Sequence, residues 1–473
     1  IHPILLLDGD DWTYISFPRE ALPSPGDWNP ARVLPEMLMP AVGAVAAHLV
    51  APLLGDYLNA ITATYAFVIS TAIVGYLLCF SRWLAKDRKL GLAQNLLLTL
   101  LFLAVHFWMF RKEYEGNIYL FQARNLTCYF FYTIPTLLCA SLVLIFETDQ
   151  KIWDHASVTG KGVLLLLSYL AVFSNMFSSI VIVAYSGVVL LQQLFSKAGS
   201  KPTIKTLWGI LLENGIFLCI ILMWLVSLGF ELTGGRAVAV GIDSPASGFT
   251  QVFTGFIRVL GSMSKYFCLM VFVGCSYATV LLIRNLRKKD KNENVMFLGS
   301  RSFRFIGAGI VTLVYQFLLC GVTGLTHYIE SADVLISIFF FALVELFIIV
   351  LFALAENPKL GVLIPLVLCV AVSLCDTWGD TYKESNMYED SSAITASITR
   401  DIYNQIMDAQ DQGLTAVDIK VPVFDGDENW PVAYYMGGVI PKTLYEHGQL
   451  ATLIEVTIVP DIERNELLGM PIP

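Results

Sequence analysis

The sequence contains few charged residues. Only 15% of its 473 residues are Asp, Glu, Lys or Arg, whereas soluble domains carry about a quarter. Hydrophobic residues make up 56% of the chain, and they gather in runs of roughly 20, the length that crosses a lipid bilayer. The shortage of charge therefore excludes an ordinary soluble protein and indicates an all-α polytopic membrane protein.

The sequence also lacks the signatures of several functional classes. Its nine cysteines lie in or beside apolar runs, and none has the spacing of a metal site, so they predict neither a disulfide framework nor a zinc centre. There is no glycine-rich phosphate loop and no dinucleotide fingerprint, so we expect no nucleotide or redox cofactor. We also expect no nucleic-acid partner, and the sequence leaves a divalent metal open.

The apolar runs predict a membrane topology. Residues 4–7 are interpreted as the end of a first transmembrane helix that begins upstream, and residues 33–54, interrupted by prolines, as a re-entrant or interfacial segment on the outer side. Lys-rich loops follow every second span, which by the positive-inside rule puts the N-terminus in the cytoplasm and the C-terminus outside. Together with the truncated helix, about 11 spans are expected, the other ten at residues 59–80, 96–110, 126–146, 163–173, 180–195, 207–228, 266–283, 305–322, 334–354 and 360–375.

The C-terminal part differs in composition from the rest. It has 17 acidic and 5 basic residues from Asp376 onward, within a chain of net charge −9. Isoleucines recur every four residues from 394 to 406, which predicts an amphipathic helix, and residues 417–423 and 453–459 have the pattern of strands. The sequence thus predicts a membrane domain at 1–375, with a first outer loop and interfacial helices at 8–57, and a small extracytoplasmic α/β module at 376–473.

The start of the first outer loop, residues 8–14, combines three carboxylates with aromatic residues. Carboxylates crowded at the end of an apolar segment are costly unless a cation or a proton is to sit there. A carboxylate can deprotonate a hydroxyl, and Arg or Lys can hold a phosphate. This mixture at a membrane surface suits transfer of a sugar from a lipid-linked phosphate, whereas the simpler interpretation is a solvated acidic loop that helps to set topology.

Two motifs in this loop carry a resemblance. Asp10-Asp11-Trp12-Thr13-Tyr14, followed by Trp28-Asn29-Pro30-Ala31-Arg32, resembles the first outer loop of the polytopic glycosyltransferases of the GT-C superfamily. It is most similar to the GtrII-like O-antigen glucosyltransferase group. The resemblance implies that Asp10 is the base acting on an acceptor hydroxyl, that Asp11 orients substrate or a metal, and that Arg32 holds the donor phosphate.

The resemblance also implies substrates, a location and further site residues. The donor would be a polyprenyl-phosphate sugar, and the acceptor a glycan or glycolipid of the cell envelope, such as lipopolysaccharide, at the outer face of a bacterial inner membrane. The further candidates for donor-phosphate binding are Arg111, Lys112, Arg124 and Arg236. The candidates for substrate binding are Trp12, Tyr14, Trp28, Glu36, His327 and Glu330.

Two other functions remain open from the sequence. A transporter or flippase for a lipid-linked sugar would need an ionisable group near the middle of the membrane, and Glu345 in the tenth span is the clearest such residue. A membrane scaffold with a sensing tail would need neither Asp10 nor Glu345, but it would need the module that follows Asp376.

Overall fold

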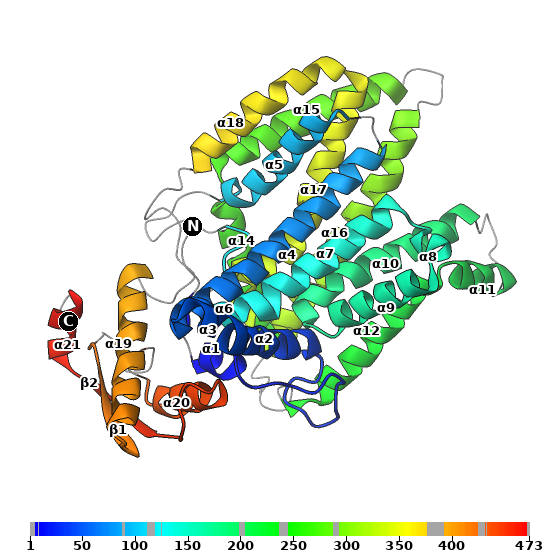
Figure 1. Ribbon diagram of the computed structural model, residues 1–473. Coiled ribbons are helices and arrows are strands. Elements are labelled where there is room, and N and C mark those ends of the chain that lie inside the picture. Colours follow the sequence, from blue (N-terminus) through cyan, green and yellow to red (C-terminus); the bar gives the residue numbers. More distant parts are fainter. Residues whose placement is uncertain are drawn as a thin grey trace.

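The structure is a helical bundle with a small α/β module beside one of its ends (Figure 1). The computed structural model describes residues 5–7, 9–87, 90–110, 119–123, 125–197, 204–235, 245–286, 293–375, 392–423, 431 and 433–470. Eight of the described helical segments are long and apolar enough to cross a membrane, and three shorter apolar helices accompany them. The composition therefore predicted the class of fold correctly.

Seven of the ten predicted spans coincide with long helical segments, and three with the shorter ones. The long segments are α4 (Tyr57–Asp87), α6–η2–α7 (Leu126–Cys128, Tyr129–Thr133 and Ile134–Thr148), α10 (Met176–Lys197), α12 (Gly215–Thr233), α15 (Lys265–Leu286), α16 (Glu293–Thr323) and α17 (Ala332–Glu356). The short ones are α5 (Leu92–Trp108), α9 (Val158–Val172) and η4–α18 (Pro358–Val362 and Leu363–Cys375). The eighth long segment is α2–η1–α3 (Val33–Val45, Ala46–Val50 and Ala51–Leu54).

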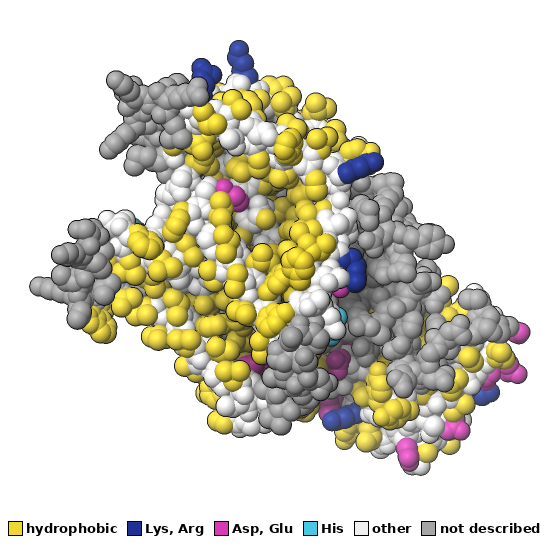
Figure 2. Space-filling view, turned by 180° about the vertical axis from the view of Figure 1, so that it is seen from behind, with side chains coloured by type: hydrophobic (Ala, Val, Ile, Leu, Met, Phe, Trp, Pro, Cys, Tyr) yellow, Lys and Arg dark blue, Asp and Glu magenta, His cyan; other side chains and the backbone are white. Residues whose placement is uncertain are grey.

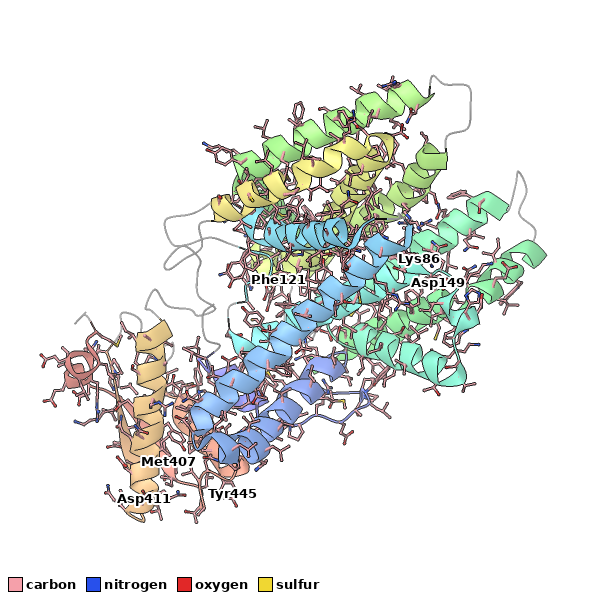
Figure 3. All side chains as sticks on the ribbon, turned by 45° about the horizontal axis from the view of Figure 1, so that its top comes forward. Lys86, Phe121, Asp149, Met407, Asp411 and Tyr445 are labelled. Atoms are coloured by element: carbon pink, nitrogen blue, oxygen red, sulfur yellow. The ribbon has the colours of Figure 1, made fainter. Side chains whose placement is uncertain are left out.

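The two ends of the bundle differ in charge. At one end, which we call the basic end, Lys86 of α4 donates a hydrogen bond to the carbonyl of Thr148, the last residue of α7, and Lys86 and Asp149 line a groove of about 410 Å³ there (Figure 3). Figure 2 shows hydrophobic side chains over the body of the bundle, Lys and Arg at its upper edge, and Asp and Glu over the module. The module end is the opposite one, where α4 and α6–η2–α7 meet through the rings of Tyr65 and Phe130, 5.3 Å apart.

The segment α2–η1–α3 keeps both of its ends near the module end. The backbone N–H of Leu34 donates to the carbonyl of Phe173, just after α9, at 3.0 Å. Its other end turns at Gly55, where φ is +69°, and enters the first turn of α4. Between them, the hydroxyl of Tyr65 donates to the carbonyl of Met39 at 2.6 Å. The segment therefore runs along the module end of the bundle, and its placement in the membrane interface stays a prediction.

Two predictions between residues 204 and 263 were wrong. The predicted span 207–228 is divided at Asn214 into α11 (Ile204–Glu213) and α12, because the Asn214 side chain donates to the carbonyl of Ile210 at 2.8 Å and to Gln193, in competition with the helix backbone. The stretch between the predicted spans 207–228 and 266–283, where no helix was predicted, contains a 17-residue helix, α14 (Pro245–Gly261). Helix α12 begins eight residues and ends five residues later than the predicted span, so Glu231 lies in its last turn.

A buried ion cluster joins α7 to α16 in the half of the bundle nearer the basic end. Both carboxylate oxygens of Glu147 accept hydrogen bonds from Arg304, at 2.8 and 2.5 Å, and Arg301 lies 3.2 Å away. Tyr185 of α10 donates to the same carboxylate at 2.7 Å. The cluster was not predicted from the sequence, because Glu147 and Arg304 lie 157 positions apart in the chain.

The C-terminal module is a βαβ unit covered by a helix. Strands β1 (Ala416–Val421) and β2 (Glu455–Pro460) pair in parallel, with Ala416 opposite Glu455, and parallel strands require a crossover, which α20 (Met436–Glu446) provides. The isoleucine stripe of α19 (Ser392–Asp411) packs against β1, and α21 (Ile462–Leu468) closes the chain. The predicted pair of strands is confirmed as a two-stranded sheet, with each strand shifted by one or two residues from the prediction.

The module docks on the bundle through α20. His447, which follows α20, accepts a hydrogen bond from the Tyr57 hydroxyl at Nδ1 (2.7 Å) and donates from Nε2 to the carbonyl of Ile15 (3.1 Å). The hydroxyl of Thr443 donates to the carbonyl of Trp12 at 2.6 Å. The buried imidazole therefore links the module to both α4 and the first loop as a neutral ring.

The Glu147 cluster predicts a large effect of one substitution. Glu147→Ala leaves two buried arginines without their carboxylate, which we expect to cost about 3–5 kcal/mol of unfolding free energy. Asp149→Ala, two residues on, removes a half-exposed carboxylate near His155 and should cost less than about 1 kcal/mol. Thermal unfolding of both variants in detergent checks this, and equal midpoints would contradict a structural role for the cluster.

The docking of His447 predicts a dependence on pH. Burial lowers the pKa of His447 to about 4, from an ordinary 6.5; the Ile15 carbonyl and Glu446 raise it, and nearby His48 lowers it. The neutral ring stabilises the folded state fully above pH 6.5, and this contribution is lost as the pH falls toward 4, by up to about 3 kcal/mol. The unfolding midpoint should drop over this range, and it should drop less in His447→Gln; identical pH profiles for the two proteins would argue against this link.

Candidate functional site

Asp11 anchors the first loop to the bundle. Its Oδ1 accepts hydrogen bonds from the backbone N–H and the hydroxyl of Thr127, at 2.7 and 2.6 Å, and its Oδ2 accepts one from the N–H of Leu7 at 3.1 Å. The residue is 0% exposed, and Thr127 lies in the first turn of the helix that leads into η2. Asp11 therefore links α1 (Gly9–Tyr14) to α6 and has a structural role.

Asp10 lies on the exposed side of the same short helix. Its neighbour Gly9 packs so tightly on the module that an added Cβ would be 2.4 Å from a ring atom of Tyr435. Trp12 is buried in the core, and Tyr14 is half-buried, with its ring 5.0 Å from that of Phe131 in η2. Asp10 is therefore held at a rim between the bundle and the module.

Arg32 is a half-buried cation among aromatic rings. Its guanidinium lies 5.3 Å from the ring centre of Phe131 and 5.8 Å from that of Tyr132, a range in which a cation is attracted to a ring face. Burial alone would lower its pKa, but Tyr132, Glu231 and Tyr328 outweigh it, so the pKa of Arg32 lies above its ordinary value. The guanidinium is permanently charged, and Glu231 is one of the groups whose charge raises its pKa.

Glu231, which raises the pKa of Arg32, belongs to a set of polar groups from α12 and α16. Within the part of the chain that the structure describes, the buried atoms Glu231 Oε2, Tyr315 Oη and Trp224 Nε1 have no hydrogen-bond partner. The rings of Trp224 and Tyr315 lie 5.5 Å apart. Since an unbonded buried polar atom costs about 1–3 kcal/mol, this grouping favours a bound polar molecule or ordered water.

A set of ion pairs centred on Arg19, which we call the Arg19 clasp, fixes the segment that leads to Arg32. Arg19 donates to Glu36 Oε2 and to Asp27 Oδ2, both at 2.6 Å. The carbonyl of Asp27 accepts from the N–H of Gly235, just after α12, at 3.2 Å, so the first loop covers the end of α12 that bears Glu231. Glu36, predicted to bind substrate, is thus paired within this clasp, and Arg19 was not predicted.

The other predicted site residues are dispersed. Trp28 is largely exposed and packs against Gly235. His327 is exposed in η3 (Thr326–Glu330), and Glu330 accepts from Arg258 of α14 at 2.7 and 2.9 Å. Asp8, Arg111, Lys112, Arg124 and Arg236 lie outside the described residues.

The aromatic ring of Tyr328 connects η3 with the Arg32 grouping. It stacks on Phe177, with ring centres 5.3 Å apart, and lies 5.8 Å from Tyr132. Tyr132, Tyr315 and Trp224 lie within the predicted spans and were not predicted as site residues. Glu231 was not predicted either; the one local signal for it is an acidic residue at the end of an apolar run, and spacing does not identify its partner.

The described residues contain no group of three or more His, Cys, Asp or Glu side chains arranged to hold a metal ion. Arg32 can bind an anion. The carboxylates of Glu231 and Asp10 can accept a proton or a hydrogen bond from a hydroxyl group.

The two adjacent aspartates give opposite expectations for stability. Asp11→Asn places an amide N–H₂ where donors already point, so we expect a loss of about 1–3 kcal/mol. Asp10→Asn alters an exposed carboxylate on the same helix and should change stability by less than about 0.5 kcal/mol. Unfolding midpoints measured in one detergent separate the two, and a stable Asp11→Asn protein would show that the contact with Thr127 is dispensable.

Comparison with known proteins adds no relative to this picture. No protein family, curated protein or solved structure matches the chain.

Proposed function

We propose that this protein is a glycosyltransferase that moves a sugar from a polyprenyl-phosphate donor to a cell-surface glycan or glycolipid. The observation that carries the proposal is the grouping of Arg32 with Glu231 beneath the first loop, at one end of a membrane bundle. Arg32 is a permanent cation whose pKa Glu231 raises, and Glu231 Oε2 has no partner among the described residues. A cation and a carboxylate in one region suit a reaction in which a phosphate leaves and a hydroxyl is deprotonated.

The proposed reaction uses these groups in one displacement. A carboxylate takes the proton of the acceptor hydroxyl, whose oxygen attacks the anomeric carbon of the donor sugar. The bond from that carbon to the phosphate oxygen breaks, and its electron pair leaves with the lipid phosphate. Arg32 stabilises the negative charge that develops on this leaving group.

Two carboxylates are candidates for the base. The resemblance to GT-C enzymes favours Asp10, which is exposed on α1. The electrostatics favour Glu231, which raises the pKa of Arg32 and has a buried oxygen without a partner among the described residues. Tyr14 of α1 and Arg32 contact the same ring, that of Phe131 in η2. The helix that carries Asp10 and the segment that carries Arg32 therefore meet at η2. We retain Asp10 as the base and assign Glu231 to orienting the substrate.

The membrane setting is part of the same proposal. By the positive-inside rule we assign the basic end to the cytoplasm of a bacterial inner membrane, which would put Arg32 and the module at the outer face. An apolar groove of about 390 Å³ between α5, α15, α17 and α18 supports contact with lipid chains.

The proposal predicts the effects of two substitutions on sugar transfer. With polyprenyl-phosphate [14C]glucose as donor and cell-envelope lipid as acceptor, Arg32→Gln should lower kcat/KM by about 10- to 100-fold, because a charged hydrogen bond to the phosphate is lost. Asp10→Asn should abolish transfer while the unfolding midpoint is retained. Lys265→Gln is the matched control, since Lys265 is an exposed cation over the ring of Tyr266, at 5.1 Å.

Two results would count against these assignments. Full transfer by Asp10→Asn together with loss in Glu231→Gln would move the base to Glu231. Full transfer by both Arg32→Gln and Asp10→Asn would refute the enzymatic proposal.

The runner-up remains a transporter or flippase for a lipid-linked sugar. Glu345 of α17 favours it, because Oε1 accepts from Ser302 at 2.6 Å whereas Oε2 has no partner among the described residues. Flux of a fluorescent polyprenyl-phosphate sugar across vesicles, blocked by Glu345→Gln and unaffected by Arg32→Gln, would favour transport over transfer.

A further inference from the structure

A polar groove lies at the junction between the module and the bundle, apart from the Arg32 grouping. It has a volume of about 370 Å³ and is lined from the bundle by α3 and the turn into α4, and from the module by Arg400, Tyr403 and Gln449. Ligand sites in proteins start at about 300 Å³ and are common where two structural units meet. The groove is therefore large enough for a sugar ring.

The charges in the groove are balanced. Arg400 forms an ion pair with Asp56, Nη2 to Oδ2, at 2.9 Å, and Asn59 donates to the same carboxylate. An anion such as a phosphate would have to compete with Asp56 for the guanidinium. The balance favours a neutral ligand over a charged one.

Hydrogen-bonding capacity nevertheless remains in the groove. Among the residues that the structure describes, Arg400 bonds only through Nη2, and Gln449 uses its Oε1, which accepts from the Tyr403 hydroxyl at 3.3 Å. Nε and Nη1 of Arg400 and Nε2 of Gln449 are left as planar donors, and the Tyr403 oxygen as an acceptor. Donors and acceptors side by side match the adjacent hydroxyls of a sugar, each of which both donates and accepts.

The wall of the groove on the bundle side is suited to a membrane. The short helix α3 contributes Ala51 and Pro52 to the lining and exposes Leu53 and Leu54, which are 85% and 55% exposed. It ends a segment that is apolar enough to lie in a bilayer. A lipid whose chains run along these leucines would bring its headgroup to Arg400.

We infer that this groove binds the sugar headgroup of a neutral glycolipid. The inference goes beyond the proposed transfer reaction, since binding here requires neither Arg32 nor Asp10. It also assigns a function to the junction, because the ligand would contact the bundle and the module together.

Native mass spectrometry of the full-length protein in detergent tests the inference. The probes are diglucosyl-diacylglycerol, diacylglycerol and phosphatidylglycerol, with maltotetraose as a free sugar. We expect the glucolipid to bind at least about tenfold more tightly than either other lipid, and maltotetraose to compete with it. Equal binding of all three lipids would overturn the inference, as would binding of maltotetraose without the glucolipid.

Matched variants locate the site. Arg400→Gln should weaken glucolipid binding about tenfold, whereas Arg464→Gln should leave it unchanged; Arg464 forms a comparable ion pair with Asp401, at 3.1 Å, on the same module but outside the lining. Tyr403→Phe removes one hydroxyl without breaking an ion pair, and it should weaken binding by a smaller factor while the unfolding midpoint is kept. Equal affinities in Arg400→Gln, Tyr403→Phe and the unmodified protein would refute the assignment.

Discussion

The hydrogen bonds of Asp11 to Thr127 hold together the part of the molecule where three units meet. They fix α1 against the helix that carries η2, and the same α1 segment offers its carbonyls to Thr443 and His447 of the module. A charged acceptor with three donors is stable in a buried position because its charge is dispersed over them. The first loop, the ring of Phe131 and the docking of the module all depend on this carboxylate.

The ionic groups of the bundle are divided between its two ends. Near the basic end, both carboxylate oxygens of Glu147 accept short hydrogen bonds from the buried Arg304. At the module end, Arg32 lies among rings, and Glu231, which raises its pKa, keeps one oxygen without a partner among the described residues. Because an incomplete polar grouping is costly in a membrane protein, the second grouping has the character of a binding site and the first that of a structural support.

Much of the fold could be predicted because its signals are local. An apolar run of about 20 residues has few alternatives to a spanning helix, and the isoleucine stripe and alternating valines of the module depend only on periods of 3.6 and 2. The errors came where side-chain chemistry overrode hydropathy. Asn214 divides a run that reads as continuous, and Gly248 lets α14 approach α16 so closely that a Cβ would be 2.5 Å from the carbonyl of Gly321.

The candidate site was less predictable, because its members come from distant parts of the chain. The sequence by itself determined that the chain is a helical membrane protein with a two-stranded module, since hydrophobic length and periodicity act within one segment. Only the tertiary structure decided that Asp11 is hydrogen-bonded to Thr127, that Glu36 is paired with Arg19, and that Glu231 raises the pKa of Arg32. The physical reason is that the partner of a buried charge is set by how helices pack, which can bring together residues about 200 positions apart.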